Sequence, residues 1–227
     1  MWCSTEKTLS STTIGPVSGS SNCVSLPHLA AYLLMSAGLI LLAACHPQLG
    51  PSEFRQTGSA FAKEPYLVRL VNRAKFDAAL RPIVLPNANN EKPGTIVIDT
   101  NSRHLYLVES ADQVVRYGIA VGAAGKVWKG TATIGKKEKW PAWYPTDDMK
   151  AVLPGMPERI PPGPDNPLGA RALYLYQGGR DTLYRIHGTS EPWTIGKRAS
   201  SGCIRMFNED AIALYDKVQV GAKVIVR

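Results

Sequence analysis

The sequence predicts a mainly β domain, a sandwich or barrel of short strands with one late α-helix and a long irregular, lid-like segment. From Gly94 onward, roughly seven or eight short runs of β-branched and aromatic residues alternate with turn residues. Apolar residues recur at helical spacing after Asn208. Between these features, residues 140–169 hold eight prolines and no clear periodicity.

The strands follow one another along the chain. Residues 95–98 and 105–108 flank the turn residues Asn101 and Ser102, which predicts a hairpin. Residues 114–121 continue the meander. Further strands are expected over residues 131–134, 172–176, 183–187 and 224–226.

The late helix is expected to run from Asn208, a good capping residue, to about Lys217. The irregular segment over residues 140–169 is too long for a turn, and long ordered loops are commonly functional. We expect a lid over a site there. Trp143 and Tyr144 within it either pack on a substrate or belong to the core.

Three regions are expected along the chain. Residues 1–44 read as a signal peptide of lipoprotein type, because Leu29–Ala44 is uncharged, shorter than the ~20 residues of a membrane span, and followed by Cys45. A buried core helix is the alternative, and the usual basic residue before the apolar run is missing. Residues 45–93 are expected to form a tether that could hold a short helix over 64–80, and residues 94–227 a catalytic domain.

Composition indicates a globular protein of basic character. Hydrophobic residues make up 44% of the chain and charged residues 19%, and the formal net charge is +8. A basic protein attracts polyanions, among them nucleic acid, anionic lipid and acidic cell-wall polymer. Since the sequence has no long basic run and no zinc-finger spacing, we expect no nucleic-acid partner.

Cysteine usage singles out one thiol. Cleavage before Cys45 would remove Cys3 and Cys23, and Cys45 itself would carry the lipid. Cys203 is then left as a lone thiol in an exported protein, where cysteines are usually paired or avoided. It is either a reactive group or a small buried apolar residue.

His187 is the best partner for Cys203. It ends a predicted strand, and Cys203 follows after a polar loop. Of the other histidines, His28 and His46 fall in the leader and tether, and His104 lies in a hairpin strand. An imidazole that takes the thiol proton produces a thiolate nucleophile.

The residues around the thiol suit acyl transfer. Gly202 lets the backbone approach a substrate, so the N–H groups of Gly202 and Cys203 could point at an oxyanion. Arg205 shares a face with Cys203 on extended backbone and suits a substrate carboxylate. An ordinary turn glycine and a surface arginine are the simpler interpretations.

These residues together resemble the active-site signature of the L,D-transpeptidases, the YkuD-type or ErfK-like catalytic domain. The resemblance rests on His187-Gly188-Thr189, on Ser-Ser-Gly-Cys-Ile-Arg-Met over residues 200–206, and on upstream segments at 130–135, 140–146 and 163–172. It covers about residues 94–227. Many members carry a histidine directly before the Gly-Cys pair, where this chain has Ser201.

The resemblance implies a role for each matching residue. Cys203 would attack the third residue of a peptidoglycan tetrapeptide stem, with His187 as acid and base and the Gly188 carbonyl orienting the imidazole. Gly202 and Cys203 would hold the oxyanion. Arg205, Ser201, Trp143 and Tyr144 would contact the substrate.

The resemblance also implies the partners. A stem amine or a lysine of an envelope protein would resolve the thioester, a carbapenem would form an adduct, and no metal or organic cofactor is implied. A hydrolase of the same fold and a non-catalytic wall-binding lipoprotein remain alternatives. The lipid on Cys45 would be the only membrane attachment, in the periplasm, and His46 favours the outer membrane.

Overall fold

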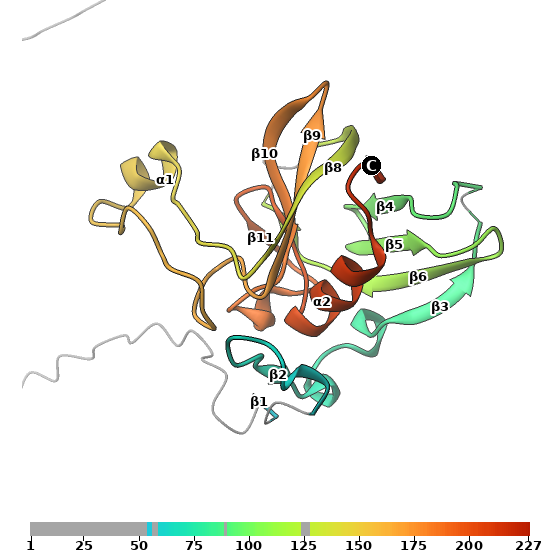
Figure 1. The fold of residues 1–227 in the computed structure, drawn as a ribbon, viewed down its shortest axis with the longest axis horizontal. Helices are drawn as coiled ribbons and strands as arrows, with labels where there is room; N and C mark the ends of the chain where they lie inside the picture. The colour runs from blue at the N-terminus through green and yellow to red at the C-terminus, as the bar shows by residue number, and fades with distance from the viewer. Residues whose placement is uncertain (1–53, 56–58, 89, 124–127) are drawn as a thin grey trace, which may run out of the picture. The chain divides into compact units, whose positions relative to one another are not determined.

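The computed structural model describes residues 54–55, 59–88, 90–123 and 128–227 (Figure 1). The expected leader over residues 1–44 and the lipidation site Cys45 lie outside these residues. The described residues belong to the compact unit assigned to Cys45–Arg227. None of the helices among them is long and apolar enough to cross a membrane.

A mixed sheet of nine strands, in the order β12-β10-β9-β8-β13-β4-β5-β6-β3, forms the frame of the described domain. Neighbours are antiparallel except for two parallel pairs, β10 with β12 and β13 with β4. The strands are β3 Ile83–Pro86, β4 Ile96–Asp99, β5 His104–Val108, β6 Gln113–Gly118, β8 Gly130–Lys139, β9 Arg171–Gln177, β10 Arg180–His187, β12 Ile204–Arg205 and β13 Lys223–Val226.

The mainly β fold is confirmed, including the hairpin of β4 and β5, in which Ile98 pairs with Leu105. β8 is longer than predicted, because its polar residues after Ile134 continue to pair with β9. A separate short pair joins β7 (Val121–Gly122) to β11 (Arg198–Ser200).

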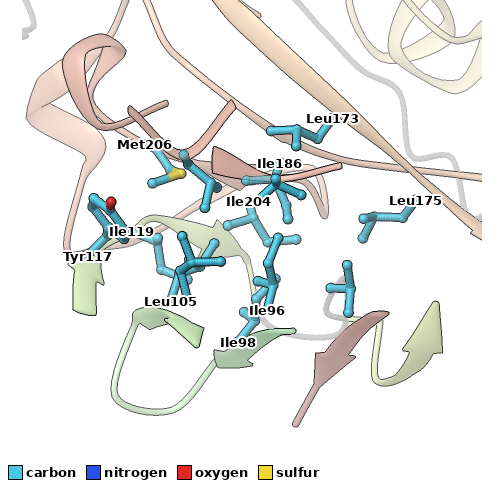
Figure 2. Close-up of a cluster of buried hydrophobic side chains, with 14 of the residues drawn as sticks. Ile96, Ile98, Leu105, Tyr117, Ile119, Leu173, Leu175, Ile186, Ile204 and Met206 are labelled. Atoms are coloured by element: carbon cyan, nitrogen blue, oxygen red, sulfur yellow. The ribbon is translucent and has the colours of Figure 1, made fainter. Parts of the chain in front are cut away.

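The two ends of the sheet curve around one apolar core. Ala120, which follows β6, exchanges two backbone hydrogen bonds of 2.9 Å with Arg205 of β12 at the opposite end. The helix α2 (Asn208–Lys217) packs Ala211 and Leu214 into the same core. Figure 2 shows core side chains from both ends of the sheet, among them Ile96, Ile98, Leu105, Ile186, Ile204 and Met206.

The helix expected over residues 64–80 is wrong. This stretch forms the strand β2 (Leu70–Val71), paired with β1 (Phe54–Arg55), and two 3₁₀ turns, η3 (Arg73–Lys75) and η4 (Ala78–Leu80). A further 3₁₀ turn, η2, covers Ser59–Phe61. Asn72 and Asp77 each accept a hydrogen bond from the backbone two residues on, and such local bonds compete with a continuous helix.

This N-terminal segment packs against the domain, although it lies inside the expected tether. β3 forms an edge of the main sheet by pairing with β6. Glu64 accepts a hydrogen bond of 2.9 Å from Arg171 of β9, and Arg73 donates one of 2.7 Å to Asp210 of α2. The described residues before and after position 93 therefore pack together. A boundary between two sequence modules at this position stays a prediction.

Residues 140–169 are irregular, as predicted, apart from the short helix α1 (Asp147–Val152). Figure 1 shows this segment extending away from the strands, with α1 at its outer part. Trp143 and Ile160 exchange backbone hydrogen bonds at its base. A lid function for the segment stays a prediction.

Candidate active site

The parallel pairing of β10 with β12 brings the predicted catalytic residues together. Ile186 pairs with Ile204 and His187 with Arg205, so one step earlier Cys203 lies beside Arg185. Alternate residues of a strand share a face. Cys203, His187 and Arg205 therefore lie on one face of the sheet, opposite to the core residues Ile186 and Ile204.

His187 is held in a defined orientation. Its side chain is buried, and Nδ1 lies 2.6 Å from the carbonyl oxygen of Gly188. The carbonyl can only accept, so Nδ1 carries the proton and Nε2 is left as the acceptor. The predicted contact between His187 and the Gly188 carbonyl is present.

Asn208 fixes the backbone that follows His187. Its Oδ1 accepts hydrogen bonds from the N–H groups of Ala170 and Thr189, at 3.0 and 3.1 Å, and its Nδ2 donates to the Thr189 carbonyl at 2.8 Å. A Cβ at Gly188 would lie 2.1 Å from Asn208 Oδ1, which explains why glycine follows His187. The expectation that Asn208 caps α2 is wrong, because the cap position is Phe207. The Asn208 side-chain amide instead bonds to backbone groups that are distant in sequence.

Replacing Asn208 by alanine is expected to lower the free energy of unfolding by about 1–3 kcal/mol, because buried backbone groups lose their partner. The acylation rate should fall as well, since the Gly188 carbonyl loses its support. Urea unfolding and the rate of β-lactam adduct formation measure the two effects. Asp216→Ala on the same helix is the control, and equal stability of the two variants would contradict the assignment.

A tight turn presents Cys203. Ser200 Oγ donates to the Cys203 carbonyl at 2.5 Å and accepts from the Gly202 N–H at 3.1 Å. Gly202 has φ +135°, a backbone conformation that favours glycine. In this arrangement the Gly202 N–H is already engaged, so it can meet an oxyanion only if Ser200 Oγ releases it. The oxyanion role of the Cys203 N–H stays a prediction.

Burial disfavours the charged form of both the thiol and the imidazole. Burial raises the pKa of Cys203 above its usual 9.0, against the lowering effects of the Arg185 backbone and of the charges on Arg185 and Arg205. Burial, and after it the charge of Arg205, lowers the pKa of His187 to about 3. The thiol donates to the Leu183 carbonyl over a long 3.9 Å, and among the described residues it makes no hydrogen bond to His187. The raised pKa of the thiol means that its deprotonation near neutral pH needs a base.

Arg205 already holds a carboxylate of this chain. Its Nη1 lies 2.6 Å from Glu191 Oε2, and the Glu191 side chain is 48% exposed. Exposed ion pairs contribute little to stability, so an incoming carboxylate can replace Glu191. The predicted substrate role of Arg205 is compatible with this geometry and stays a prediction.

Ser201, Trp143 and Tyr144 are the other residues that were predicted to contact the substrate. Ser201 is exposed in the turn before Gly202, and Tyr144 is 63% exposed in the irregular segment. In the described part of the chain, no hydrogen bond links Ser201, Trp143 or Tyr144 to Cys203 or His187. Their substrate contacts stay predictions.

Two residues of the site were missed by the sequence analysis. Arg185 lies beside Cys203, and strand alternation from His187 could have found it. Asn208 was identified only as a cap. No group of three or more histidine, cysteine, aspartate or glutamate side chains that could bind a metal occurs among the described residues.

The family model and the curated relatives that match this chain belong to one family. The family model of the L,D-transpeptidase catalytic domain, YkuD, matches residues 93–226. Probable L,D-transpeptidase YbiS of Escherichia coli K12 is 37% identical over 150 residues, which cover 63% of this chain and 46% of that protein. Probable L,D-transpeptidase ErfK/SrfK of Salmonella typhimurium LT2 is 35% identical, with the same coverage. The chain spans about half the length of these curated relatives.

One solved structure, from Brucella melitensis, is 49% identical and covers 69% of this chain and 99% of that chain, with a TM-score of 0.47. It bears the name probable carnitine operon oxidoreductase caia. That name describes a different chemistry, and at this TM-score the likeness carries no argument about activity.

Proposed function

Because this chain belongs to the YkuD family of L,D-transpeptidase catalytic domains, we propose that it transfers acyl groups between peptidoglycan stem peptides through a thioester on Cys203. The products are 3→3 cross-links or envelope proteins attached to the wall. The observation that carries this proposal is the register of β10 and β12, which puts the Cys203 thiol on the same face as an imidazole fixed by Gly188.

Acylation begins with proton transfer. The Cys203 thiol rotates from the Leu183 carbonyl, gives its proton to Nε2 of His187, and its sulfur attacks the carbonyl of the third stem residue. The Gly188 carbonyl stabilises the imidazolium through Nδ1–H. When the tetrahedral intermediate collapses, His187 returns the proton to the leaving amine of D-alanine, and the thioester remains.

Deacylation reverses these roles. An acceptor amine attacks the thioester and loses its proton to His187, and the sulfur leaves and is protonated again. Water in place of the amine gives hydrolysis, so the acceptor decides between a transpeptidase and a hydrolase. No step needs a metal or an organic cofactor.

The sequence of residues 29–45 supports a second part of the proposal. We propose that the chain is exported to the periplasm and held by a lipid on Cys45, in reach of the wall, with the outer membrane as the favoured location. The supporting features are the uncharged run Leu29–Ala44 and the cysteine that follows it. Labelling with a radioactive fatty acid tests the anchor, with Cys45→Ala as the control.

Incubation with a disaccharide-tetrapeptide tests the activity. We expect cross-linked dimers and free D-alanine, detected by mass spectrometry. Monomeric tripeptide alone would indicate a hydrolase of the same fold. No turnover and no acyl-enzyme would favour a non-catalytic wall-binding protein.

A further inference from the structure

A groove of about 480 Å³ is lined by none of the residues Cys203, His187 and Arg205. Three segments line it, namely residues within 75–80, 102–104 and 193–197. The first segment holds the turn η4, and the third includes the 3₁₀ turn η5 (Pro192–Thr194). The first segment also lies outside residues 93–226, which match the family. The volume of the groove is in the range of roughly 300–1,000 Å³ that is usual for ligand sites.

Hydrogen bonds join the three segments around the groove. His104 Nε2 donates to the Ala79 carbonyl at 3.2 Å. The Ile119 N–H donates to the Arg103 carbonyl, and the Ile119 carbonyl accepts from the Gly196 N–H, both at 3.0 Å. The backbone around the groove is therefore fixed before a ligand arrives, as in most small-molecule sites.

Part of the lining is apolar. Phe76, Leu80 and Ile195 belong to one hydrophobic cluster, and Trp193 lines the same groove. Trp193 is partly exposed, and in the part of the chain that the structure describes its indole makes no hydrogen bond or ring contact. A flat apolar face with one N–H donor suits a ring that carries both C–H and hydroxyl groups.

The charged part of the lining is mainly cationic. It holds Lys75, Arg103 and Lys197 and one carboxylate, Asp77. Asp77 already accepts a hydrogen bond of 2.9 Å from the backbone two residues on. Burial lowers the pKa of His104, so its ring adds little charge at neutral pH. A cleft with an excess of one sign of charge attracts ligands of the opposite sign, and this groove therefore favours an anion.

The groove adjoins the catalytic residues along the chain. Trp193 comes two residues after Glu191, which pairs with Arg205. Lys197 directly precedes β11, which leads into the turn that presents Cys203. A ligand in the groove is therefore held by segments that continue into the proposed active site.

We propose that this groove binds a saccharide that carries an anionic group. Trp193 packs against the C–H face of the sugar ring, and Arg103 and Lys197 bind the carboxylate or phosphate. The inference rests on the proposed function, because a wall glycan with its stem carboxylates has this chemistry and brings a stem towards Cys203. A phosphorylated saccharide of the envelope has the same chemistry, and the experiment distinguishes the two sources.

Binding of small saccharides to the intact protein tests the site without any catalysis. N-acetylmuramic acid is the carboxylate-bearing ring, and glucosyl phosphate is the phosphate-bearing ring. N-acetylglucosamine supplies a ring without the charge, and lactate and inorganic phosphate supply the charge without a ring. We expect at least one charged saccharide to bind about tenfold more tightly than these controls in an NMR titration, because ring and charge act together. Its identity gives the source.

Trp193→Ala and Lys197→Gln should each remove most of this preference, and Trp193→Phe should retain part of it. Lys129→Gln, which changes an exposed lysine before β8, is the matched control and should bind as the wild type does. If Trp193→Ala does not fold, Lys197→Gln decides.

A wild-type protein without the preference, or a preference that Lys197→Gln retains, overturns the saccharide site. Tighter binding of adenosine monophosphate than of either charged saccharide would overturn it as well, in favour of a nucleotide. Absence of any acyl-enzyme in a protein that still binds the saccharide would instead overturn the proposed function.

Discussion

Cys203→Ala is expected to abolish carbapenem acylation and to reduce cross-linking by at least about 10³-fold, because the substitution removes the sulfur that forms the thioester. His187→Ala should slow acylation by about 10²–10⁴-fold, since the neutral thiol then has no base. Mass spectrometry of the intact protein measures the adduct directly. The acylation rate should also not fall between pH 8 and 5, because His187, with its pKa lowered to about 3, stays neutral there.

His104→Gln is the matched control for the histidine variant. His104 lies on β5, where its ring contacts the Ala79 carbonyl rather than the thiol. We expect its adduct to form at the wild-type rate. An adduct that persists in Cys203→Ala, or the lack of one in the folded wild-type protein, would show that the thiol is not the nucleophile.

Glu64→Ala is expected to lower the free energy of unfolding by about 3–5 kcal/mol, the usual cost of leaving a buried charge without its partner. Glu64 accepts hydrogen bonds from Arg171 and from Trp140 Nε1, and Arg171 is only 1% exposed. The Arg171 carbonyl in turn accepts from the Gly188 N–H at 3.0 Å. Loss of this pair should therefore also slow acylation, although Glu64 lies outside the residues that match the family.

Urea unfolding compares this variant with Glu109→Ala. Glu109 pairs with Lys217, but both side chains are far more exposed than Arg171. Exposed pairs contribute about 0–1 kcal/mol, so the control should change little. Equal losses in the two variants would contradict the structural role assigned to the N-terminal segment.

The strands and the late helix could be predicted because their signals are local. Alternation of apolar residues and turn residues marks β4, β5 and β10, and helical spacing marks α2. The helix predicted over residues 64–80 from the same kind of signal was wrong. Its apolar spacing suggested a helix, but tertiary partners such as Arg171 and Asp210, together with the local bonds of Asn72 and Asp77, stabilise a different path.

The sequence by itself determined the fold class, the family resemblance and the pair Cys203 and His187, because a strand pattern and a motif are properties of neighbouring residues. Only the tertiary structure decided which hydrogen-bond partners and neighbours these two residues and the backbone around them have. In the folded chain, Asn208 accepts a hydrogen bond from the backbone after His187, and the Gly202 N–H donates to Ser200 Oγ. Arg185 lies beside Cys203 because of the register of β10 and β12. The physical reason is that hydrogen bonds and charges are satisfied by partners distant in sequence, whose identity depends on strand order and register.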